Sequence, residues 1–164
     1  MASGTPALPP LTFGGGTALF DATAQTLVAA PDPDRRRFGT VLTDGGENRS
    51  VIDATTLLEA AKASDVVLDF VFPMPANTEL PSETNWNLLE RVAQTTGGQM
   101  IRLTHADLGA GFVEAIDDFR VSYMLRYTPQ GVKRGGWHEI KVDVAHPPAA
   151  RPYEVRARKG YYSQ

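Results

Sequence analysis

The stretch VVLDFVF, residues 66–72, decides the fold. It is apolar at every position except Asp69 and does not alternate with polar residues, which is typical of a strand buried on both faces of a parallel sheet. Residues 38–43 and 99–103 are two further short strand-like runs, and we expect all three to form adjacent parallel strands. A buried carboxylate must be paired or protonated. The sequence offers Asp69 no partner, and its simplest account is a gap in an incomplete layer.

Helical periodicity separates these strands. Apolar residues recur at helical spacing in four segments: 17–29, 53–63, 83–96 and a stretch that begins with the capping-box-like pair Thr104 and Asp107. Thr17 is expected to cap the first helix, and Gly97 with Gly98 to end the third. Because helices alternate with strands, the sequence predicts an α/β fold with a parallel sheet and helices on both of its faces.

The last third of the chain changes to period-two alternation. Residues 121–127, 137–145 and 153–159 each alternate apolar with polar side chains, and proline and glycine separate them. This pattern predicts a C-terminal antiparallel β-meander packed on the α/β part, with Tyr123, Leu125 and Ile140 buried.

The predicted organisation is therefore one α/β unit with additions at both ends. Residues 1–13 are rich in proline and are expected to be a flexible tail. Residues 14–120 form the α/β part, and residues 121–164 form the β extension. A chain of 164 residues is long enough to bury a substantial core.

Composition excludes several functional classes. The formal charge of −3 argues against nucleic acid as a partner, since phosphate binding needs a concentrated basic excess. The absence of cysteine excludes disulfides, thiol nucleophiles and zinc–thiolate sites, and leaves the redox compartment undecided. No apolar run approaches the ~20 residues of a membrane helix. The first residues lack the basic and apolar regions of a signal peptide.

Two groups of segments carry a resemblance to a known family. The sequence GGGTALFDAT (14–23), followed by a strand that ends in TDG (43–45), resembles the second half of a von Willebrand factor A-type domain. The tail segments SYMLRYTP (122–129), WHEIKVDV (137–144) and YEVRARKGYY (153–162) resemble the C-terminal extension of the VWFA-related proteins typical of Acidobacteria. The resemblance spans about residues 14–162. It implies a Rossmann-like three-layer α/β/α fold that lacks its first strands.

The resemblance also implies a metal-ion-dependent adhesion site. In that family a D-x-S-x-S loop, a threonine and an aspartate hold the ion; Thr17 matches the threonine and Asp44 the aspartate. No S-x-S occurs in this chain, so the D-x-S-x-S loop has no match. The expectation is a partial metal site at Thr17 and Asp44, flanked by the ligand-binding positions Gly16 and Gly45. We expect no cofactor in this chain and Mg²⁺ in an intact parent, because Mg²⁺ demands six oxygen ligands.

Each candidate residue also has a plainer interpretation. Asp44 followed by two glycines fits an Asx-type turn. Residues 14–17 before a helix could cradle a phosphate on backbone N–H groups. However, neither of the glycine-rich phosphate-binding patterns, G-x-x-x-x-G-K-S/T and G-x-G-x-x-G, is present. The histidines are scattered, and His138 is expected to be a hydrogen-bonded structural residue.

The sequence thus favours a non-enzymatic protein-binding or scaffold module, because no nucleophile, base and orienting group can be assembled from these motifs. Two alternatives remain open. One is an enzyme with a carboxylate site near Asp44, at the carboxyl ends of the strands; the other is a purely structural remnant. With the family's first strand missing, the backbone of residues 39–42 is expected to form an open edge that self-associates or is covered by residues 5–13. The compartment is undecided, although the resembled family often carries export signals.

Overall fold

A computed structural model describes residues 14–28, 35–73, 83–103, 108–145 and 154–163. The predicted tail 1–13 and the capping pair Thr104 and Asp107 lie outside these ranges. The elements are, in chain order, α1 (Leu19–Leu27), β1 (Arg37–Leu42), α2 (Ala54–Ala63), β2 (Val66–Pro73), α3 (Glu83–Thr96), β3 (Met100–Leu103), α4 (Leu108–Arg120), β4 (Trp137–Glu139) and β5 (Gly160–Tyr162).

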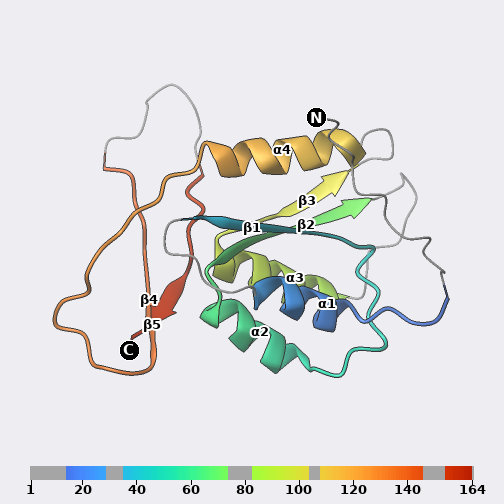
Figure 1. Cartoon of the computed structure of the whole chain (residues 1–164), viewed down its shortest axis with the longest axis horizontal. Coiled ribbons are helices and arrows are strands. Elements are labelled where there is room, and N and C mark those ends of the chain that lie inside the picture. The colour runs from blue at the N-terminus through green and yellow to red at the C-terminus, as the bar shows by residue number, and fades with distance from the viewer. Residues whose placement is uncertain (1–13, 29–34, 74–82, 104–107, 146–153, 164) are drawn as a thin grey trace, which may run out of the picture.

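The three predicted strands form one parallel sheet in the order β1-β2-β3. Thr40 of β1 lies opposite Asp69 of β2, and Val71 of β2 lies opposite Ile101 of β3. Figure 1 shows α1, α2 and α3 on one side of this sheet and α4 on the other. The α/β fold and the parallel sheet predicted from the sequence are therefore confirmed.

The central strand β2 explains why the run VVLDFVF lacks alternation. Leu68, Phe70 and Phe72 pack into the larger core with side chains of α1, α2 and α3. Val71 packs on the opposite face with Ile101 of β3 and with α4. Since both faces of β2 are covered, apolar side chains are needed on both.

The expected boundaries of α2 and α3 hold within one residue, whereas α1 begins two residues after and ends two residues before the predicted 17–29. The N-cap residue is Ala18, not Thr17, and its side chain makes no capping hydrogen bond. The predicted Thr17 cap is therefore wrong. At the end of α3, Gly97 adopts a left-handed φ of +84°, a conformation that favours glycine, so the predicted stop at this position is confirmed.

The C-terminal extension differs from the predicted meander. Its strands are short, and β4 pairs antiparallel with β5, which begins after the predicted run 153–159. Residues 121–127 form no strand, Tyr123 is 91% exposed and Leu125 is 71% exposed. Ile140 is half-buried. The period-two pattern was therefore misleading for 121–127, because alternation reports compatibility with a strand and not the presence of a partner strand.

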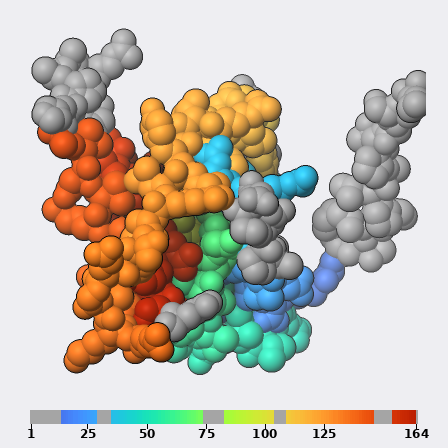
Figure 2. All heavy atoms as spheres, turned by 60° about the vertical axis from the view of Figure 1, so that its left-hand side comes forward, coloured from blue at the N-terminus to red at the C-terminus, as the bar shows by residue number. Residues whose placement is uncertain are grey.

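The extension contacts the helices at the amino ends of the parallel strands (Figure 1). The Lys159 N–H donates to the Thr95 carbonyl oxygen at the end of α3. Arg158 Nη2 donates to the Lys62 carbonyl oxygen at the end of α2. Figure 2 shows the residues that follow α4, in orange, spread beside the red C-terminal residues.

Candidate functional site

Asp44, the main candidate from the sequence, lies in the loop 43–53 that follows β1. This loop lies beyond the carboxyl ends of the strands, opposite the C-terminal extension (Figure 1). Asp44 is exposed, and its Oδ1 accepts a hydrogen bond of 2.9 Å from the Gly46 N–H. A side chain that bonds the backbone two residues ahead forms an Asx turn. The structure thus gives Asp44 the turn geometry of the plainer interpretation.

Thr17 and Gly16 contact the same loop, but at Asn48 and Arg49, which lie four and five residues after Asp44. The Thr17 N–H donates to Asn48 Oδ1 (2.9 Å), and the Thr17 carbonyl oxygen accepts from the N–H groups of Asn48 and Arg49. A Cβ on Gly16 would collide with the Asn48 and Arg49 side chains, so glycine permits this close approach. A phosphate cradle over residues 14–17 would have to compete with these bonds.

Gly45 has a structural role in the turn. Its φ is +82°, its N–H donates to Thr43 Oγ1 (2.9 Å), and its carbonyl oxygen accepts from Asn85 Nδ2 of α3 (3.2 Å). The buried Gly45 therefore links the loop to α3.

Glu47 is the carboxylate that organises the loop, and sequence reasoning missed it. Its Oε1 accepts from the N–H groups of Arg49 and Ser50, and its Oε2 accepts from Ser50 Oγ and from the Phe20 N–H of α1. Burial is the largest single influence on the pKa of Glu47 and raises it. The hydrogen bonds together outweigh burial and lower the pKa from 4.5 to about 2. Glu47 is therefore ionised and serves as a cap for α1.

Two aspartates complete the connection between the loop and the helices. Asp21, in the first turn of α1, accepts from the N–H groups of Val51 and Ile52. Asp53 caps α2 by accepting from the Thr56 N–H at 2.7 Å. All the carboxylates described so far lie near the carboxyl ends of the strands and accept hydrogen bonds from backbone N–H groups. They therefore serve as structural acceptors.

The donors near Asp44 do not fit Mg²⁺. The ion needs near-octahedral oxygen geometry, whereas the matched pair supplies one carboxylate, whose Oδ1 already accepts a backbone bond, and a threonine that meets the loop elsewhere. Within the described ranges, no three acidic or histidine side chains gather as a metal-binding group.

The buried Asp69 has a partner that the sequence did not reveal. Asp69 is 3% exposed, and its Oδ1 accepts from the Gln99 N–H at 2.9 Å. The Gln99 side chain donates to Asp118 Oδ2 of α4 (3.2 Å), and Arg156 pairs with the same Asp118 oxygen. Burial raises the pKa of Asp69, and the Gln99 hydrogen bonds only partly offset it. The network links β2, the residue before β3, α4 and the C-terminal extension.

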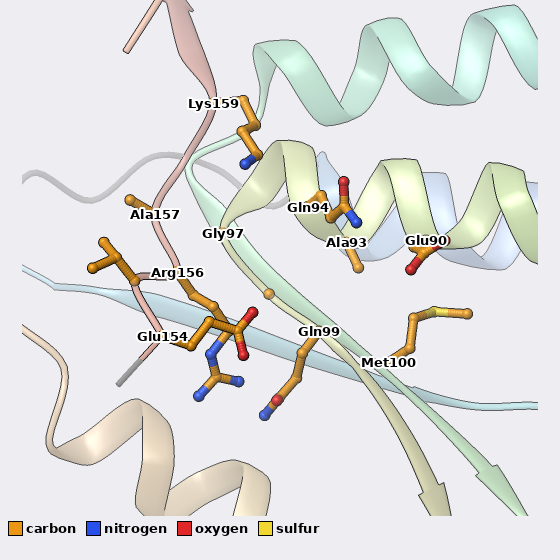
Figure 3. A pocket seen from close by; sticks show the side chains of 12 residues that line it. Glu90, Ala93, Gln94, Gly97, Gln99, Met100, Glu154, Arg156, Ala157 and Lys159 are labelled. Carbon is orange, nitrogen blue, oxygen red and sulfur yellow. The ribbon is translucent and has the colours of Figure 1, made fainter. Parts of the chain in front are cut away.

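Two hollows lie at the other end of the molecule from Asp44. The larger, of about 340 Å³, lies between the end of α3, the start of β3 and residues 154–159. In Figure 3 the side chains of Glu154, Arg156 and Gln99 gather on one side of it, and Glu90 lies with Met100 on another. The second, of about 260 Å³, lies beside Trp137. The larger hollow is lined by both acidic and basic groups, so its charge selects no ligand class.

His138 has the structural role expected of it. Its Nε2 lies 3.1 Å from the Lys133 carbonyl oxygen and 3.2 Å from Ser163 Oγ, and its ring stacks on Tyr161. In the part of the chain that the structure describes, no helix has the length and apolarity to cross a bilayer. The chain matches no family model, no curated protein and no solved structure.

Proposed function

We propose that this protein is a non-enzymatic protein-binding module of von Willebrand A type, whose partner pairs with the open edge of β1. One observation carries the proposal. Among the described residues, β1 is the terminal strand of the sheet and pairs on one side only, with β2. An edge strand of a sheet is a template for another strand.

The direction of the backbone groups in β1 follows from one hydrogen bond. The Thr43 N–H donates to the Val71 carbonyl oxygen of β2 at 3.0 Å. Backbone groups of successive residues in a strand point to opposite sides, so odd-numbered residues of β1 face β2. The N–H and C=O groups of Phe38, Thr40 and Leu42 therefore face the open edge.

Apolar side chains accompany this edge. Leu42 at the end of β1 is 47% exposed. Phe38 and Phe119 stack with ring centroids 5.0 Å apart, so this face of β1 lies beside α4. Exposed apolar surface next to an open strand favours a binding role.

The contrast with an enzyme rests on the surroundings of Asp44. An active-site carboxylate is expected in a pocket and with a perturbed pKa. Asp44 is exposed in a turn, and the two hollows described above are lined by other elements. The strongly perturbed Glu47 is bonded to the backbone of α1. These features support a binding module over an enzyme with a carboxylate site near Asp44.

A displayed library of random ten-residue peptides, selected on the immobilised protein, tests the proposal. We expect peptides that bind wild type and lose binding to Thr40→Pro, which removes one outward N–H and leaves the bonds to β2 in place. Thr40→Ser keeps the N–H and should bind normally. Selected peptides that bind Thr40→Pro as well as wild type would contradict the edge site. A protein that enriches no peptide would favour the structural remnant.

A further inference from the structure

We infer that the partner at this edge is a second copy of the chain, with the two β1 strands antiparallel about a two-fold axis through Thr40. The inference rests on the proposed function, because it uses the same open edge. It goes further by naming the occupant and the register of pairing.

The outward groups of β1 are self-complementary about Thr40. Phe38 and Leu42 lie at equal distances along the strand from Thr40, and all three present their N–H and C=O groups to the open edge. A two-fold axis through Thr40 places each Phe38 opposite the second copy's Leu42 and the two Thr40 residues opposite each other. Residues in this arrangement form the hydrogen-bonded pairs of an antiparallel ladder. The same surface then serves both copies, as a two-fold interface requires.

The charges that flank β1 select the antiparallel direction. Arg36 and Asp44 are both exposed, flank β1, and lie four positions before and four positions after Thr40 in the sequence. Antiparallel pairing therefore brings each Arg36 opposite the Asp44 of the second copy. Parallel pairing would align like charges, which is unfavourable.

The fold holds both charged groups in place. Arg36 Nη1 donates to the carbonyl oxygens of Phe119 (3.0 Å) and Ser122 (2.8 Å), and its guanidinium lies 4.6 Å from the centre of the Phe119 ring. Asp44 is held by the Gly46 N–H. Because these contacts limit their motion, bringing the two groups together across an interface costs less side-chain entropy than pairing two free side chains.

Side-chain packing adds an apolar contribution. Phe38 and Leu42 lie on the same face of β1, since they are four positions apart and side chains alternate between the faces of a strand. The exposed Leu42 would cover the second copy's Phe38, and the reverse contact repeats by symmetry. Pairs of aromatic and aliphatic side chains directly opposite each other stabilise antiparallel strands.

Paired charge variants at Thr40 test both the occupant and the register by sedimentation velocity. Wild type is expected to form a dimer as its concentration rises. Thr40→Lys and Thr40→Glu should each be monomeric, because the axis sets two like charges opposite each other. An equal mixture of the two variants should restore a heterodimer. Thr55→Lys and Thr55→Glu, on the exposed side of α2, serve as matched controls and should dimerise like wild type.

A second variant keeps the test valid if changes at Thr40 disturb folding, which circular dichroism would detect. Asp44→Arg changes an exposed residue and places two arginines opposite each other at both ends of the interface. We expect its dimer dissociation constant to rise by about tenfold or more.

Three results would overturn the inference. They are a wild-type monomer at concentrations up to about millimolar, dimerisation of Thr40→Lys alone, and no effect of Asp44→Arg. A wild-type monomer that still selects peptides at the β1 edge would reject the second copy as occupant and leave the proposed function standing. An intact wild-type dimer that selects no peptide would support the second copy as occupant, because the dimer then covers the edge that a peptide needs.

Discussion

The Phe20 N–H at the start of α1 donates to the Glu47 carboxylate at 2.8 Å, across a sequence separation of 27 residues. The amino end of α1 is thus capped by the loop that follows β1. A carboxylate at a helix amino terminus also interacts favourably with the helix dipole. The first helix and the loop 43–53 are therefore one structural unit.

Glu47→Gln should lower the free energy of unfolding by about 1–2 kcal/mol at neutral pH, the usual cost of losing a helix cap. Because the pKa of folded Glu47 lies at about 2, below its ordinary value of 4.5, its stabilising effect is complete above pH 4.5. The effect is lost as the pH falls through about 2. Urea denaturation at several pH values measures it, and a difference that does not shrink towards pH 2 would contradict the capping role.

Asp69→Asn should show the opposite dependence on pH. Burial raises the pKa of Asp69 above 3.8, so the folded state disfavours its charged form. Wild type therefore loses stability relative to Asp69→Asn as the pH rises from below 3.8 through the raised pKa. Asparagine keeps an oxygen that can accept from the Gln99 N–H. Chemical denaturation should find the two proteins alike in acid and the variant at least as stable at pH 7; a variant less stable at pH 7 would disprove this.

Asp44→Asn should change the free energy of unfolding by only about 0–1 kcal/mol, because asparagine can keep the turn bond to the Gly46 N–H. The change should be equal with and without Mg²⁺, since we expect this chain to bind Mg²⁺ no better than about millimolar. Melting curves across a Mg²⁺ titration measure both. A rise in melting temperature at micromolar Mg²⁺ that Asp44→Asn abolishes would show that a metal site is complete after all.

Gly98→Ala should destabilise the protein by about 1–3 kcal/mol. A Cβ at this position would overlap the Leu68 carbonyl oxygen and come within 2.7 Å of Asp69 Oδ1. Gly14→Ala is the matched control, since nothing lies within 4 Å of its Cβ position. Thermal unfolding of both variants should show a loss for Gly98→Ala alone; equal melting temperatures would mean that β2 and β3 are further apart than described.

Leu125→Ala should cost less than about 0.5 kcal/mol, because Leu125 is 71% exposed. The sequence alone would have predicted a buried residue and a much larger loss. Leu57→Ala, at a fully buried position of α2, should cost about 2–5 kcal/mol. Urea denaturation compares the two. A loss of several kcal/mol for Leu125→Ala would show that residues 121–127 do pack in solution.

The parallel sheet could be predicted from the sequence because its signal is local. The run VVLDFVF is apolar on both faces, because α1, α2 and α3 cover one face of this strand and α4 covers the other. The extension could not be predicted at the same level. Residues 121–127 have apolar side chains at every second position, but a strand also needs a neighbour, and that depends on chain segments far away in the sequence.

The candidate site shows the same limit. Asp44 stands out in the sequence because two glycines follow it, and the Asx turn is a local arrangement that sequence reasoning considered. Glu47 has no such local signal, since its bond to Phe20 forms only when α1 packs beside the loop. Asp69 stood out as a buried acid, but its partner is the backbone N–H of Gln99, just before β3, and this bond leaves no mark in the sequence.

The hydrogen bonds between the C-terminal extension and the end of α2 have a consequence for how the chain folds. Arg158 bonds the Lys62 carbonyl oxygen across 96 residues, and the Tyr162 hydroxyl bonds Glu59 across 103. Such contacts raise the contact order, which slows folding. At typical rates of synthesis, about 5–20 s pass between the making of α2 and the making of the segment that fastens it. During that interval the end of α2 lacks these two bonds, and a nascent chain can present it there to a chaperone or a protease.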